Sequence, residues 1–296
     1  MNRRELISTG LGAAALALGF RPARAQYPGL RFGYAAITWG GNDRQAIEDV
    51  AALGFRGIQL RASAVSEWGD RPDELKELLA SRDLTMVALS SGNMRLDPAR
   101  EAEELEAHTG NARFVRDVGG LYLQVIDERP RGREPTADDF RRMGRLLTEL
   151  GRRTADLGIP LGYHNHMNAL GEAPDEVARV LDAADPRFVR LELDTAHYQQ
   201  GGGDPVQAIR QYGDRLLFLH IKDVESPVPG GKPDSYRFVE LGRGKVDFPA
   251  VFGALEEVAF EGWGIVELDS VPDEAQTPKE SGTISRRYLE TLGFDI

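Results

Sequence analysis

The sequence predicts an α/β fold, a single (β/α)8 TIM barrel, from two observations. From residue 27 onward, short apolar or β-branched runs alternate with longer amphipathic segments, which is the pattern of a parallel sheet covered by helices. Eight such pairs can be counted in about 270 residues, close to the ~250 residues that are typical of this barrel.

Each expected strand is followed by an expected helix. The strands cover residues 32–38, 57–61, 85–90, 122–126, 160–164, 189–194, 216–221 and 264–268. The helices cover residues 44–53, 72–81, 97–118, 137–157, 174–184, 205–212, 248–258 and 278–292. Pro72, Pro205 and Pro278 stand at helix starts, where the fixed φ of proline suits the first turn and no amide hydrogen is needed. Gly158 and Pro160 similarly separate the fourth helix from the fifth strand.

An open doubly wound sheet is the alternative arrangement of these elements. It predicts a glycine-rich phosphate-binding turn after the first strand, but residues 37–42 read ITWGGN and lack that motif. No linker or low-complexity tract divides residues 26–296, so we expect one barrel domain there. Residues 224–236 are the most loop-like internal segment and follow the seventh strand, where a barrel places loops over its catalytic face.

Residues 1–25 have the layout of an export signal. Arg3 and Arg4 precede an apolar run at residues 11–20, and small residues follow at a cleavage-like site ending at Ala25. The apolar run is shorter than the roughly 20 residues that span a bilayer, so we expect no stable membrane insertion after the signal is removed. The start NRRELI resembles a twin-arginine signal, which implies export of the folded protein to the periplasm.

Composition excludes several classes of function. The chain has no Cys, so disulfides, thiolate nucleophiles and Cys metal sites are excluded. Its net charge is −11, and without residues 1–25 it becomes −14. This charge opposes the phosphates of nucleic acid, so we expect no nucleic-acid partner. We expect the chain to bind a small-molecule carbohydrate or polyol. The sequence leaves open whether the chain forms a homo-oligomer.

Histidines and carboxylates gather at the expected carboxyl ends of four consecutive strands, where barrels place their active sites. The residues are His164 and His166, Asp194 with His197, His220, and Glu267. Leaving such groups buried and unpaired is costly, whereas one divalent cation satisfies them together. Nitrogen and oxygen ligands of this kind suit Mn, Co, Zn or Fe(II) better than Ca or Mg. The alternative is a purely structural cluster, in which Asp194 is only a helix cap.

Four segments, GYHNH (162–166), LDTAH (193–197), LHIKD (219–223) and VELDS (266–270), resemble the xylose isomerase-like TIM-barrel superfamily. This superfamily includes ketose 3-epimerases, inosose dehydratases and apurinic endonucleases, and the resemblance covers essentially the whole chain after residue 25. It implies that Asp194, His220 and Glu267 are metal ligands. The family usually places a Glu-Asn pair on strand five. This sequence has His164-Asn165, so the fourth ligand role passes to His164.

The resemblance implies a divalent-metal-dependent isomerase or epimerase of a sugar, keto-sugar or polyol. Such an enzyme abstracts a proton to form a metal-stabilised enediolate. We expect Glu267 and His166 to transfer protons and Lys222 to neutralise an enediolate oxygen. We expect His197, Lys222 and Trp39 to contact the substrate. The alternatives are that His197 caps a helix, Lys222 forms an exposed ion pair and Trp39 packs in the core.

Other functions remain open. A lyase or dehydratase, either inosose dehydratase-like or keto-glycoside-cleaving, would use the same proton abstraction. Ketose 3-epimerases use two Glu residues and only Glu267 is present, which leaves more room for this alternative. A non-catalytic metal-dependent carbohydrate-binding protein is a further alternative. An apurinic endonuclease fits poorly, because residues 224–240 contain no His and the net charge is strongly negative.

Overall fold

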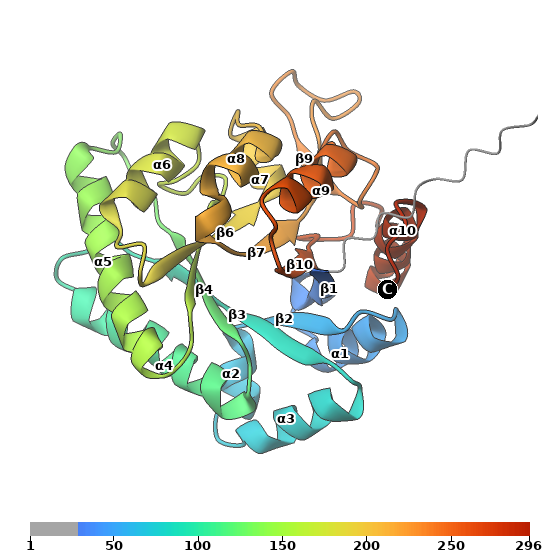
Figure 1. Ribbon diagram of the computed structural model, residues 1–296, viewed down its shortest axis with the longest axis horizontal. Coiled ribbons are helices and arrows are strands. Elements are labelled where there is room, and N and C mark those ends of the chain that lie inside the picture. The colour runs from blue at the N-terminus through green and yellow to red at the C-terminus, as the bar shows by residue number, and fades with distance from the viewer. Residues whose placement is uncertain (1–28) are drawn as a thin grey trace, which may run out of the picture.

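A computed structural model describes residues 29–296, so the predicted twin-arginine signal lies outside the described residues and stays a prediction. Within the described part, eight parallel strands close into a barrel in the order β1-β10-β7-β6-β5-β4-β3-β2, which confirms the predicted (β/α)8 fold (Figure 1). The barrel strands are β1 (Leu30–Ala35), β2 (Gly57–Arg61), β3 (Thr85–Met94), β4 (Tyr122–Asp127), β5 (Leu161–His164), β6 (Val189–Asp194), β7 (Leu216–Ile221) and β10 (Gly262–Val266).

The helices surround the strands (Figure 1). They are α1 (Asp43–Ala52), α2 (Ser63–Trp68), α3 (Pro72–Ser81), α4 (Glu101–Val118), α5 (Ala137–Asp156), α6 (Pro174–Ala183), α7 (Thr195–Gln200), α8 (Pro205–Tyr212), α9 (Phe248–Glu257) and α10 (Pro278–Thr291), with short 3-10 turns η1 (Ala36–Trp39) and η2 (Gly213–Arg215). No helix in the described part of the chain is both long enough and apolar enough to cross a membrane.

The long helix α5 shows how local sequence produces this layer. Thr136 and Asp139 form a capping box, which satisfies amide groups that the first turn leaves open. Phe140, Met143 and Leu147 follow at helical spacing and are buried. The apolar stripe packs inward while charged residues face solvent, so the helix covers the barrel rather than standing alone.

Three of the differences from the sequence prediction lie near the mouth of the barrel. The first strand ends at Ala35 rather than at residue 38, and the chain turns as η1, where the Thr38 hydroxyl donates to the Leu268 carbonyl at 2.5 Å. The last strand ends at Val266, so Glu267 is the first residue beyond it. The segment predicted as a loop, residues 224–236, joins the two strands of a hairpin, β8 (Asp223–Glu225) and β9 (Arg237–Val239), called the β8–β9 hairpin below. Its connecting loop projects from the barrel (Figure 1).

Candidate metal centre

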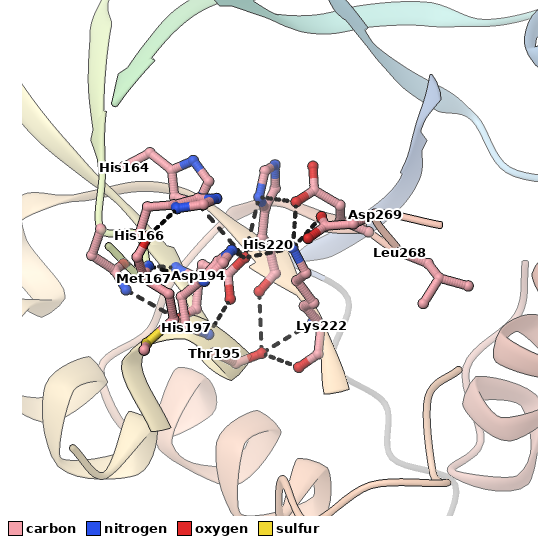
Figure 2. A network of polar contacts seen from close by, with 12 residues as sticks. His164, His166, Met167, Asp194, Thr195, His197, His220, Lys222, Leu268 and Asp269 are labelled. Atoms are coloured by element: carbon pink, nitrogen blue, oxygen red, sulfur yellow. Dashed lines mark hydrogen bonds and ion pairs between the residues drawn. The ribbon is translucent and has the colours of Figure 1, made fainter. Parts of the chain in front are cut away.

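The barrel brings the four predicted ligand residues together at its carboxyl-terminal mouth. His164 ends β5, Asp194 ends β6, His220 lies near the end of β7 and Glu267 follows β10. Asp194 Oδ2 lies 3.6 Å from His164 Nε2 and 3.5 Å from His220 Nδ1, and Glu267 Oε1 lies 3.3 Å from His220 Nδ1 (Figure 2). Four adjacent strands therefore aim two imidazoles and two carboxylates at one small volume.

Three atoms of this cluster are buried without a hydrogen-bond partner. They are His164 Nε2, Asp194 Oδ2 and His220 Nδ1. A native protein rarely leaves neighbouring polar atoms unsatisfied, because each has lost its hydration. Atoms of Asp194, His220 and Glu267 that can ligate a metal all lie within 4.8 Å of one another. The donor set and its spacing fit a divalent cation bound by nitrogen and oxygen.

The histidines are held by partners that point their open nitrogens into the cluster. On the other side of the His220 ring, Nε2 lies 2.6 Å from Glu192 Oε1 and 3.0 Å from Gln59 Oε1. The Gln59 oxygen accepts the Nε2 hydrogen, with the Glu192 carboxylate beside it, and the metal-binding form of the ring then has its lone pair on Nδ1. Gln124 Nε2 lies 2.5 Å from His164 Nδ1 and orients this ring, so Nδ1 accepts and the hydrogen of the neutral ring is on Nε2; a metal at Nε2 would need the other tautomer. Gln59 and Gln124 were not predicted from the sequence, although each is an amide inside a buried apolar strand.

Asp194 combines the two roles that the sequence left as alternatives. Its Oδ1 accepts the backbone N–H of His197 at 2.7 Å and so caps α7, while Oδ2 faces the two imidazoles. The Asn165 side chain bonds to both the N–H and the carbonyl of Asp194. The backbone at the ligand is therefore fixed from the neighbouring strand end.

Lys222 is fully buried, so the alternative in which it forms an exposed ion pair is wrong. Its Nζ lies 2.5 Å from Asp269 Oδ1, 3.0 Å from Glu267 Oε1 and 3.2 Å from His197 Nε2 (Figure 2). Asp269 was not predicted from the sequence, and it lies two residues beyond Glu267. A lysine with these partners carries a fixed positive charge beside the metal cluster.

The pKa values reflect this crowding. Burial opposes ionisation of Glu267, but His220 and Lys222 outweigh it and hold the pKa of its carboxyl well below the usual range. Burial also opposes protonation of His220, yet the carboxylates of Glu192 and Glu267 raise its pKa well above the usual value. Without a metal the cluster thus retains a proton on His220, in the place where a divalent cation would supply the positive charge.

His166 and His197 form the wall beside the cluster. Their ring centroids are 3.8 Å apart, and His197 Nδ1 accepts the N–H of Met167 at 3.1 Å. His166 is half-buried and its Nδ1 lies 2.7 Å from the Met167 carbonyl, to which it donates. Burial first, and the neighbouring His164 second, lower the pKa of His166 to about 4, so its ring is neutral near pH 7.

A pocket of about 480 Å³ opens beside His166, at the ends of β3, β4 and β5. Its lining combines apolar residues such as Ile126 and Met167 with four charged residues, which are Asp127, Glu128, Arg129 and Arg131. A pocket of this size and composition gives a polar organic molecule access to the imidazole.

The structure does not add Trp39 to the polar cluster. Its ring is 8% exposed and packs edge-to-face on Tyr34. Its indole N–H donates to Asp49 at 2.9 Å. These contacts give Trp39 a packing role, and its predicted contact with substrate stays a prediction.

The fold and the site together define an enzyme of the TIM-barrel class with a candidate divalent-metal centre. The family described as xylose isomerase-like TIM barrel matches residues 47–287. Because this match covers most of the chain, the chain belongs to that family.

Curated relatives span nearly the same length as this chain. The chain is 26% identical to inosose dehydratase of Lacticaseibacillus casei, over 88% of this chain and 96% of that protein. It is 27% identical to inosose dehydratase of Geobacillus kaustophilus, over 88% and 94% of the two chains. It is 28% identical to the rhizopine catabolism protein MocC of Rhizobium meliloti, over 81% of each.

Solved structures share the fold at lower identity. An IolI protein with a bound zinc atom superposes with a TM-score of 0.77 at 18% identity, over 90% of this chain and all of that one. A D-tagatose 3-epimerase-like protein gives a TM-score of 0.70 at 16% identity, over 88% and 98% of the two chains.

Proposed function

We propose that this chain is a divalent-metal-dependent lyase of the dehydratase type, acting on a keto-polyol or keto-sugar. The reaction removes a proton from the carbon beside a ketone and expels an oxygen substituent from the next carbon. The inosose dehydratase relatives support this choice over the isomerase or epimerase that the sequence analysis put first.

The single observation that carries the proposal is the state of His166. Its Nδ1–H is engaged by the Met167 carbonyl, its ring is neutral, and no hydrogen-bond partner occupies Nε2 within residues 29–296. A neutral imidazole facing a pocket can accept a carbon-bound proton at Nε2 and then hand it to the departing oxygen. Elimination needs both transfers on one substrate, and one histidine supplies both.

The other residues have separate roles in this reaction. His164, Asp194, His220 and Glu267 would hold the cation, which supplies a positive charge that polarises the ketone oxygen. Lys222 donates toward the oxygen that gains negative charge, and its contacts with Glu267 and Asp269 keep it oriented. His197 lies at the same wall with its Nδ1 bonded to Met167 and its Nε2 facing Lys222, and its predicted contact with substrate stays a prediction.

The proton and electron balance is complete without an added reactant. The C–H electrons form the new carbon–carbon double bond, and the bond to the leaving oxygen breaks with its electron pair. The proton taken by His166 ends on that oxygen, so the products are an unsaturated ketone and water or an alcohol. Glu267 is the second candidate for proton removal, because its carboxylate stays ionised.

Proton abstraction and product mass test this proposal. Incubating the metal-loaded protein with inososes, keto-sugars and keto-glycosides in D2O, followed by NMR and mass spectrometry, should show solvent exchange together with loss of water or an alcohol. Exchange at constant mass would assign the chain as an isomerase or epimerase. Binding without exchange would assign it as a carbohydrate-binding protein.

Two variants separate the candidate bases. His166→Gln should slow exchange by about 10²-fold or more, the usual contribution of a positioned acid–base group. Glu267→Gln should also reduce metal content, whereas His166→Gln should leave it unchanged. His108→Gln is the matched control, because His108 is a buried imidazole that bonds to Ser91 outside the cluster. Full exchange in His166→Gln would transfer the role of base to Glu267.

A further inference from the structure

An aromatic side chain outside the metal cluster lies directly against Lys222. Phe238, in β9, has its ring centroid 4.1 Å from Lys222 Nζ. The same ring packs edge-to-face on His197 with 4.7 Å between centroids. Phe238 therefore contacts Lys222 and His197, each of which lies 3.9 Å from Oδ2 of the ligand Asp194.

The β8–β9 hairpin holds this ring in place. Phe238 pairs with Val224 of β8, which follows Lys222 and Asp223 in the chain. Asp223 is fully buried and accepts the backbone N–H groups of Val224, Gly242, Gly244 and Val246. The strand that carries Phe238 is thus tied to the residue directly after the lysine.

Lys222 has carboxylates on one part of its surface and an aromatic face on another. Glu267 and Asp269 accept hydrogen bonds from the ammonium group, and the Phe238 ring covers it. The negative face of an aromatic ring attracts a cation but offers no lone pair that competes for its N–H donors. Its bulk also excludes water, which would compete for them.

We propose that Phe238 is a positioning residue that covers Lys222 and keeps its N–H donors directed at the carboxylates and the substrate oxygen. The catalytic part of this inference rests on the proposed function, whereas the covering of the lysine does not. Leucine is the informative replacement, because it keeps much of the apolar bulk and removes the aromatic face. Tyrosine keeps the face.

Lysine labelling tests whether Phe238 covers Lys222 and needs no assay of activity. The full chain, with metal, is treated with an amine-acylating reagent, and the modification rate at each lysine is measured by mass spectrometry. Lys232 in the exposed hairpin loop is the internal reference. Lys222 should be protected in the unmodified protein and in Phe238→Tyr, and about tenfold more reactive in Phe238→Leu, within the range of a cation–π contact of this kind.

Kinetics of solvent exchange test the positioning. Phe238→Leu should lower kcat by about tenfold with little change in KM, and Phe238→Tyr should restore it. Tyr236→Leu is the matched control, because Tyr236 lies in the same hairpin and packs on Phe238 at 5.7 Å between centroids. A role in packing alone would lower thermal stability in both leucine variants without this dependence on the ring.

The outcomes separate this inference from the proposed function. If the unmodified protein exchanges no carbon-bound proton of any keto-polyol or keto-sugar, the proposed function fails and labelling still tests the cover. If Lys222 stays protected in Phe238→Leu, with kcat also unchanged, Phe238 does not position the lysine. Equal loss of kcat in Phe238→Leu and Phe238→Tyr would likewise overturn the aromatic role.

Discussion

Asp194 and Asp223 are both fully buried aspartates at the mouth of the barrel, yet their surroundings are opposite. Asp223 Oδ1 accepts two backbone amides, and its Oδ2 accepts two more. Asp194 Oδ1 accepts one amide, while its Oδ2 has no hydrogen-bond partner and faces His164 and His220. One carboxylate is fully satisfied by the chain itself, and the other keeps an oxygen for a cation.

The pKa values of the Asp194 and Asp223 carboxyls reflect this difference in surroundings. Burial raises the pKa of Asp223, and its four amide bonds only partly offset this. Burial also acts on Asp194, but its interactions with His197 and with the Lys222 ammonium group hold its pKa well below the usual range. Backbone amides alone hold the carboxylate of Asp223. The carboxylate of Asp194 is instead kept ionised by its neighbours, so its free oxygen is available to a metal.

Removing the charge of the Asp194 carboxylate should have the largest effect on metal binding. Asp194→Asn keeps the shape and the cap on α7 but takes away the charged ligand oxygen. Its affinity for Mn, Co or Zn should fall by more than about 100-fold, beyond the effect of losing an outer partner, and activity should fall with it. Calorimetric titration and metal analysis measure this. Unchanged metal content would show that the cluster holds no metal through Asp194.

The unmodified protein and Asp194→Asn should also differ in how added metal changes their Tm. Added metal should raise the Tm of the unmodified protein, because a ligand that binds only the folded state stabilises it. Asp194→Asn should show no such rise, and its metal-free Tm should be lower than that of the unmodified protein, because the depressed pKa of Asp194 means that its ionised form stabilises the fold. A Tm that ignores metal in the unmodified protein would contradict the metal centre.

Replacing the satisfied carboxylate should mainly affect stability. Asp223→Ala leaves four amides without their acceptor, and we expect a loss of about 3 kcal/mol in the free energy of unfolding, because each buried unsatisfied group costs ~1–3 kcal/mol and water reaches some of them. The corresponding fall in Tm is roughly 6–12 °C. Urea unfolding measures it. The folded fraction should still bind metal, and a loss of metal at unchanged stability would reverse the assignments of Asp194 and Asp223.

The outer partner of His220 should have the smallest effect of the set. Glu192→Gln keeps a hydrogen-bond acceptor but removes the charge 2.6 Å from His220 Nε2. Metal affinity should drop by about 10- to 100-fold. Glu192→Leu should cost more than Glu192→Gln, since it removes the acceptor as well. Equal affinity in all three proteins would leave Glu192 with a packing role only.

Most elements of the barrel were predictable because each has a local signal. Strands β2, β6 and β7 and helices α3 and α8 have the predicted bounds, since apolar runs and proline starts mark them. The six-residue helices α2 and α7 and the three-residue strands β8 and β9 were missed, since such segments are too short to show a period. Phe238 was missed with them.

The sequence alone determined the barrel and the set of His and carboxylate residues at its mouth, because strand order and strand ends follow from the alternating pattern. Only the tertiary structure decided which polar atoms of these residues have no hydrogen-bond partner. Three features of the site depend on contacts between segments far apart in the chain. Four amides satisfy Asp223; Gln59 and Glu192 orient the His220 ring; and Phe238 covers Lys222. Local spacing cannot encode such contacts, since hydrogen-bond satisfaction is a property of the packed fold.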